Sequence, residues 1–223
     1  MKLSAVVLAR ALAFVETNDL DPRGSVFYPK FIPQIVERYQ FQKYPRSFEE
    51  LDETKGIEFL SGFAGRVAIQ KFTIFSNILV LETRSNTTDS RTILEEMAEW
   101  GTATFGLRPL SESVRQWAYV SDVSFTTEFD ILSTSPLERL AQKVGHAVSE
   151  IWKEPVRYHS LIAGVGHDPM ARKNGIAGFT IARRAETPFS DNKYYSEAPL
   201  PTDLHIRLLE EYELDVRRSA GSS

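Results

Sequence analysis

Residues 117–132 constrain the fold more than any other part of this 223-residue chain. Large apolar side chains occupy one parity of the stretch, and short polar or acidic side chains occupy the other. Because successive side chains of a strand point to opposite faces, this period of two predicts a β-strand with one buried face and one face in water. Such strands are typical of an antiparallel sheet covered on one side. The apolar parity holds Trp117, Tyr119, Val123, Phe125, Phe129 and Ile131, and the polar parity holds Asp122, Ser124, Thr126, Glu128 and Asp130.

Further segments carry the β-branched and aromatic residues that strands favour. Residues 57–64, 66–75 and 78–84 are separated by a glycine and by a Ser-Asn pair, which are typical of hairpin turns. Residues 157–165 and 176–185 read as two more strands joined by a glycine-rich loop. An unbroken strand over residues 117–132 would span about 50 Å, so we expect a bulge or bend within it.

The clearest helix covers residues 136–152. Ser135 and Glu138 have the spacing of a capping box, and Pro136 fits the first helical position. Apolar side chains then recur every three or four residues and form one continuous stripe, as in an amphipathic helix. The stripe contains Leu137, Leu140, Ala141, Val144, Val148 and Ile151.

Four other segments have helical character. Residues 30–39, 90–104 and 203–214 combine helical periodicity with start signals such as Thr202. Residues 4–16 also place apolar side chains at helical spacing, so we predict a helix there. A strand is the alternative for this segment, because nearly every position in it is apolar.

This order of elements predicts an α+β fold, with a mainly antiparallel sheet and helices packed on one face. Two β-β-α units side by side would account for the succession of strands and helices. No linker isolates either half, so we expect a single domain over residues 1–223. Within it, residues 1–56 form an N-terminal helical addition, residues 57–218 form the sheet-and-helix core, and residues 219–223 form a frayed tail.

Charge and cysteine content exclude several classes of protein. The net charge is −4, whereas nucleic-acid-binding proteins usually carry a basic excess, so we expect no nucleic-acid partner. The absence of cysteine excludes disulfides, thiolate metal sites and a cysteine nucleophile. No apolar run approaches the roughly 20 residues of a membrane span, and Arg10 interrupts the apolar N-terminus. We therefore expect a soluble, cytoplasmic protein that does not contact a membrane.

The stretch of residues 161–179 contains four glycines and resembles a phosphate-binding loop by composition alone. A phosphate-binding loop needs a helix N-terminus directly after its glycines. Here Pro169 interrupts the loop and a predicted strand follows, so the glycines suit a hairpin, and we expect no nucleotide or other cofactor. Whether the loop of residues 164–175 has a function of its own stays open.

The same hairpin carries the candidate polar groups. His167 and Asp168 are adjacent, and His159 lies on the preceding strand, which makes these three the weak catalytic candidates. Neighbouring side chains diverge on an extended backbone, and this spacing is not a known ligand set, so we expect no metal. Five cations form a candidate anion-binding or ligand-binding group, although strand alternation sends two adjacent ones to opposite faces. They are Arg157, Arg172, Lys173, Arg183 and Arg184.

No serine-elbow, nucleotide or thiolate-metal motif occurs, which argues against an enzyme. We predict a binding or assembly module that presents a sheet face or edge to another protein or to a second copy of itself. The alternative is an enzyme or small-ligand-binding protein that uses the 157–184 hairpin, with His159, His167, Asp168 and Arg172 as its polar groups. A weaker alternative is nucleic-acid binding through the cations of the same hairpin.

Overall fold

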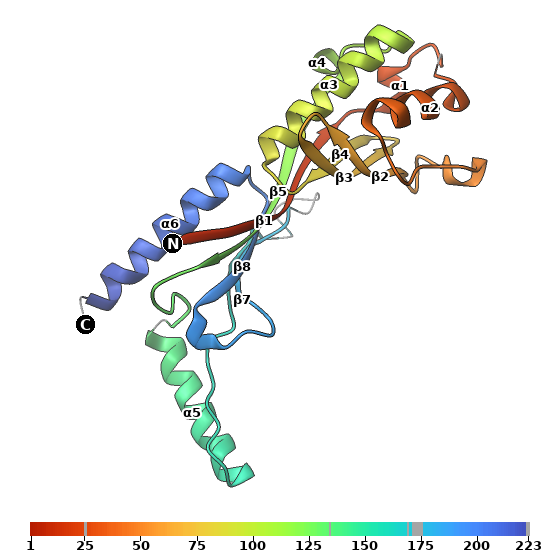
Figure 1. Cartoon of the computed structure of the whole chain (residues 1–223). Helices are drawn as coiled ribbons and strands as arrows, with labels where there is room; N and C mark the ends of the chain where they lie inside the picture. Colours follow the sequence, from red (N-terminus) through yellow and green to blue (C-terminus); the bar gives the residue numbers. More distant parts are fainter. Residues whose placement is uncertain (25, 134, 169, 171–175, 222–223) are drawn as a thin grey trace. The chain divides into compact units, whose positions relative to one another are not determined.

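The computed structural model describes the chain except residues 25, 134, 169, 171–175 and 222–223. In this described part the protein has an α+β fold, with six α-helices and eight strands in an antiparallel sheet (Figure 1). The strands are hydrogen-bonded in the order β2-β3-β4-β1-β5-β8-β7-β6. Their bounds are β1 Lys2–Phe14, β2 Ile57–Ala64, β3 Val67–Phe75, β4 Ile78–Thr83, β5 Gln116–Thr126, β6 Ile162–Val165, β7 Phe179–Arg183 and β8 Lys193–Ala198.

The helices connect and cover these strands. They are α1 Thr17–Leu20, α2 Tyr28–Tyr39, α3 Thr87–Phe105, α4 Leu110–Ser113, α5 Ser135–Trp152 and α6 Thr202–Gly221. Short 3₁₀ turns lie at Phe48–Glu50 and Phe189–Asp191.

The chain divides into two compact units, which are described separately below. The N-terminal unit contains Val6–Ser121 with Leu200–Asp203, and the C-terminal unit contains Asp122–Pro199 with both ends of the chain, Met1–Ala5 and Leu204–Ser223. Strands β1 and β5 each contribute residues to both units. The expected single domain over residues 1–223 stays a prediction.

The predicted hairpins over residues 57–84 are confirmed as β2, β3 and β4. In this meander Phe59 pairs with Phe72 across β2 and β3, and Phe72 pairs with Leu81 across β3 and β4. The predicted helix over residues 4–16 is wrong, because the segment is strand β1. Strand β1 pairs with β4, and Ala9, Ala11 and Ala13, which share one face of the strand, are fully buried.

The expected wet face of residues 117–132 is also wrong in part. Strand β5 ends at Thr126, and Ser121–Phe125 are buried at every position, including Asp122 and Ser124. The two polar side chains have partners inside the C-terminal unit. Tyr195 contacts the Asp122 carboxylate, and the Arg184 guanidinium donates to Ser124 Oγ at 3.1 Å. Polar contacts of this kind allow a strand to be buried on both faces in spite of an alternating sequence.

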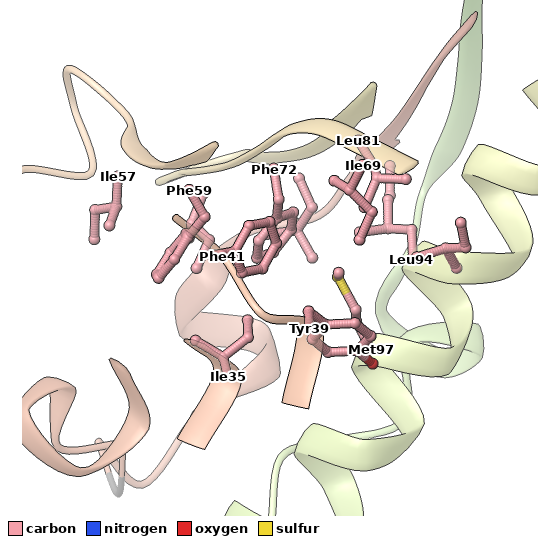
Figure 2. Close-up of a cluster of buried hydrophobic side chains, with 14 of the residues drawn as sticks. Ile35, Tyr39, Phe41, Ile57, Phe59, Ile69, Phe72, Leu81, Leu94 and Met97 are labelled. Carbon is pink, nitrogen blue, oxygen red and sulfur yellow. The ribbon is translucent and has the colours of Figure 1, made fainter. Parts of the chain in front are cut away.

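The core of the N-terminal unit lies between the meander and helices α2 and α3 (Figure 2). Phe59 is fully buried and its ring lies within 5.4–6.4 Å, centroid to centroid, of the rings of Phe31, Phe41 and Phe72. Leu94 and Met97 of α3 fill the other side of this cluster (Figure 2). Offset and edge-on ring pairs add to the free energy gained by burial. This packing fixes the two helices against the sheet.

Gly62 of β2 allows the chain after α2 to lie against the sheet. A Cβ atom at this position would lie 2.6 Å from the Phe41 ring and 2.8 Å from the Tyr39 carbonyl oxygen. Next to this contact, Lys43 forms an antiparallel bridge with Leu60 on the outer side of β2. The missing side chain is therefore a requirement of close packing.

A hydrogen-bonded network organises the C-terminal unit. The Asp130 carboxylate accepts from the Tyr194 hydroxyl at 3.0 Å and from the Arg183 guanidinium, which also donates to the Ser160 carbonyl at 2.8 Å. The Arg183 side chain is only 4% exposed. Tyr194 stacks on Phe125 of β5, and burial together with the Asp130 charge raises the pKa of Tyr194 to about 12. The network joins the loop after β5 to β7 and β8.

We predict that Gly62→Ala lowers the free energy of unfolding by about 1–3 kcal/mol, because the new methyl group overlaps Phe41 and a backbone carbonyl. Gly166→Ala is the matched control, since nothing lies within 4 Å of its Cβ position. Urea unfolding of the three proteins measures both changes. An equal stability of Gly62→Ala and the control would contradict the packing described for β2.

We also predict that Asp130→Ala lowers the free energy of unfolding by about 2–4 kcal/mol, because it leaves the Arg183 charge buried without its carboxylate. The double variant Asp130→Ala/Arg183→Met removes that charge and should be at least about 1 kcal/mol more stable than the single variant. Urea unfolding of both variants provides the comparison. If the double variant were less stable than Asp130→Ala, the unpaired Arg183 charge would not be the cause of the loss of stability.

Candidate functional site

Helix α5 exposes the apolar stripe that the sequence predicts should be buried. Within the stripe, Leu137, Leu140 and Ile151 are exposed (Leu140 to 56% and Ile151 to 75%), whereas Ala141, Val144 and Val148 are half-buried. Gly145 is buried, and the helix carries no other buried residue whose side chain the structure describes. Large contiguous apolar patches are uncommon on the surfaces of monomeric soluble proteins.

The segment after α5 runs back alongside the helix (Figure 1). A Cβ atom at Gly145 would lie 3.0 Å from the Val156 carbonyl oxygen, so this glycine permits close contact. Ser149 Oγ donates to the Gly145 carbonyl at 2.7 Å and accepts from the Val156 amide at 2.8 Å. These contacts hold the returning chain against α5 at Gly145 and Ser149.

A groove of about 230 Å³ lies along the first half of the stripe. Leu137, Leu140 and Val144 line it from the helix, and Leu161 and Ile162 line it from the chain entering β6. Strand β6 is the last strand in the sheet order and pairs with β7 from Ile162 to Val165. The exposed helix stripe and the sheet edge therefore form one apolar surface, which we call the α5–β6 surface.

The polar candidates of the hairpin lie in different surroundings. His159 contacts the Phe189 ring edge to face, with 5.3 Å between centroids. The exposed His167 ring contacts its own loop, with Nδ1 3.0 Å from the Asp168 carbonyl and Nε2 accepting from the Ile176 amide at 3.1 Å. Asp168 Oδ1 accepts from the Met170 amide at 2.9 Å, as in a turn. Within the described residues, no hydrogen bond or ring contact joins His159 to His167 or Asp168.

The structure describes three of the five candidate cations, and each has its own surroundings. Arg183 belongs to the buried Asp130 network, with its guanidinium 4.6 Å from the Phe189 ring centre. Arg184 contacts Ser124, and Arg157 is exposed at a polar cavity described below. Arg172 and Lys173 lie outside the described residues. Anion binding by these cations stays a prediction.

A polar cavity of about 400 Å³ lies beside the side of α5 that faces away from the stripe. Asp130, His146, Ser149, Arg157 and His159 are among the residues that line it. Two of the predicted hairpin residues, Arg157 and His159, therefore share this cavity. The alternative function, ligand binding or catalysis by the 157–184 hairpin, stays a prediction and would use this space.

Ser196 and His205 form a serine–histidine pair that the sequence does not reveal. Ser196 Oγ lies 2.8 Å from His205 Nε2, and both side chains are fully buried. The single hydroxyl proton of Ser196 points to the Thr180 carbonyl at 2.6 Å, so the serine oxygen accepts from the histidine N–H. A nucleophilic serine needs the opposite direction of donation. The Phe179 ring also lies 5.3 Å from the histidine ring, centroid to centroid, so the pair serves packing.

Across the described residues, no three His, Asp or Glu side chains are close enough to hold a metal ion. None of the described helices combines the length and the apolar character that crossing a membrane requires.

Comparison with known proteins gives no assignment for this site. No protein-family model matches the chain, and no curated protein matches its sequence.

Proposed function

We propose that the protein is an assembly module that binds a second copy of itself through the α5–β6 surface. The observation that supports this proposal is the exposed apolar stripe of α5. Burying one large aliphatic side chain contributes roughly 1.5–3 kcal/mol, so a stripe of several such side chains can drive association. The same surface would fit the predicted role of a sheet edge in protein contacts.

The spacing of the stripe favours a helix as the partner. Four residues of the stripe, Leu137, Leu140, Val144 and Ile151, together with Ala147 beside it, follow one another at intervals of three, four, three and four residues. With about 100° per residue they fall in an arc of about 80°, which is the narrow seam of a coiled coil. Two such helices can interlock their side chains along the seam.

The charges beside the stripe favour a second α5 in antiparallel orientation. Lys143 and Glu150 are exposed, and both lie on the same flank of the seam, seven residues apart. In an antiparallel pair with two-fold symmetry, Lys143 of each copy would face Glu150 of the other copy. The contact would therefore be complementary to itself, as a two-fold interface requires.

We predict that the protein forms a dimer and that Leu140→Glu raises the dimer dissociation constant roughly 100-fold or more. Because of the two-fold symmetry, each dimer would contain two new carboxylates in its seam. Leu140 is 56% exposed in the single chain, so the substitution should not affect folding. Sedimentation equilibrium measures the dissociation constant, and circular dichroism checks the helix content.

Gln142→Glu is the matched control, because it adds the same carboxylate to an exposed position of the same helix, away from the stripe. This variant should dimerise as the wild type does. A wild-type protein that is monomeric at its highest attainable concentration, or a control as impaired as Leu140→Glu, would rule out the proposal.

We predict further that charge reversal of Lys143 and Glu150 is compensating. Lys143→Glu or Glu150→Lys alone places like charges at two symmetric contacts and should weaken the dimer roughly tenfold. The double variant restores opposite charges and should return to within about threefold of the wild type. Sedimentation at low salt measures the three constants, and additive losses in the double variant would exclude the antiparallel arrangement.

A further inference from the structure

The N-terminal unit contains a second, unrelated cavity within its apolar core. Its volume is about 280 Å³, and its apolar lining includes Phe31, Ile35, Phe72, Leu94, Met97 and Trp100 from α2, β3 and α3. A dry apolar cavity of about 150 Å³ is enough to hold benzene. The cavity is open to solvent on the side of Asn18, Gly24 and Arg108, which are exposed, so a ligand could enter it.

Polar groups are concentrated around Glu53 in the lining of this cavity. Glu53 Oε2 accepts from Thr17 Oγ1 at 2.8 Å, and Glu53 Oε1 accepts from the Tyr28 hydroxyl. Burial and the neighbouring Glu53 raise the pKa of Tyr28, so its hydroxyl stays a donor at neutral pH. An ionised carboxylate has about four lone-pair sites, so Glu53 can accept further hydrogen bonds after these two.

The charges around the cavity favour a cationic ligand. Asp21 and Glu53 line it together with one cation, Arg108. Arg108 is exposed, whereas the two acidic residues are partly buried, so the Arg108 charge is better screened by water. Apolar walls with a few convergent polar groups are the usual composition of a small-molecule site.

We propose that this cavity binds a small aromatic or aliphatic amine, with its apolar body among Phe31, Phe72 and Trp100 and its ammonium group donating to Glu53. One ring with a three-carbon chain suits the volume, because the cavity is nearly twice the size of one that holds benzene. This site is separate from the α5–β6 surface and does not depend on dimer formation.

The test uses three probes that share the same apolar body: 3-phenylpropylamine, 3-phenylpropan-1-ol and 3-phenylpropanoate. We expect the amine to bind with a dissociation constant of about 1 mM or tighter, the alcohol to bind at least about fivefold more weakly, and the carboxylate not to bind. Calorimetry gives the constants for the full chain. The indole N–H resonance of Trp100 should shift, whereas those of Trp117 and Trp152 serve as references in the same spectrum.

Two variants separate the site from an unspecific effect. Glu53→Gln keeps an acceptor for Thr17 or Tyr28 and should bring the amine and the alcohol to equal affinity. Ala98→Leu extends a side chain from α3 into the cavity and should weaken both ligands at least about fivefold, while Ala103→Leu, on an exposed part of α3, should change neither. The urea midpoint of each variant confirms that it is folded.

Each remaining outcome overturns the proposal. If none of the three probes shows saturable binding, the cavity is not a ligand-binding site. Tightest binding of the carboxylate identifies Arg108 as the partner of the head group and excludes the amine. An unchanged amine preference in Glu53→Gln excludes Glu53.

Discussion

The need to remove apolar helix faces from water is the constraint on which most of this structure depends. Helices α2 and α3 satisfy it by packing on the β2–β4 meander, where Phe59 contacts rings from both the helix side and the sheet. Helix α5 has an equally regular apolar stripe and leaves it exposed. The physical rule that explains the core of the N-terminal unit is therefore also the basis for proposing a partner at α5.

Much of the fold can be predicted from the sequence, because periodicity is strong in its best elements. The hairpins over residues 57–84 and helix α5 follow from turn residues, capping residues and side-chain spacing, and their bounds differ from the structure by a few residues. Residues 4–16 could not be assigned in this way, since a segment that is apolar at nearly every position fits a buried strand and a helix equally well. Only its pairing with β4 decides between the two.

Other features depend on contacts that no local pattern contains. Asp122 and Ser124 look like the wet side of β5, yet Tyr195 and Arg184 reach them from far along the chain. Strand β8 is absent from the sequence-based predictions, and its Tyr194 is part of a buried stack with Phe125 of β5. Side-chain spacing predicts the apolar stripe of α5. It does not predict that the stripe is exposed, because burial depends on how the rest of the chain packs. Glu53 and Tyr28 likewise lack any motif, and only the fold brings them to one cavity.

The contact at Gly62 has a consequence for how the sheet ends. Because no side chain stands there, residues 42–43 lie along β2, and the Lys43 bridge together with the Gln42 amide takes up hydrogen-bonding groups of Leu60 that would otherwise face outward. A strand from another molecule could not pair with the middle of β2, because the backbone groups of Leu60 are already hydrogen-bonded to residues 42–43. Backbone groups of an edge strand that are already paired are not available to another strand, and the missing side chain at Gly62 makes this close approach possible.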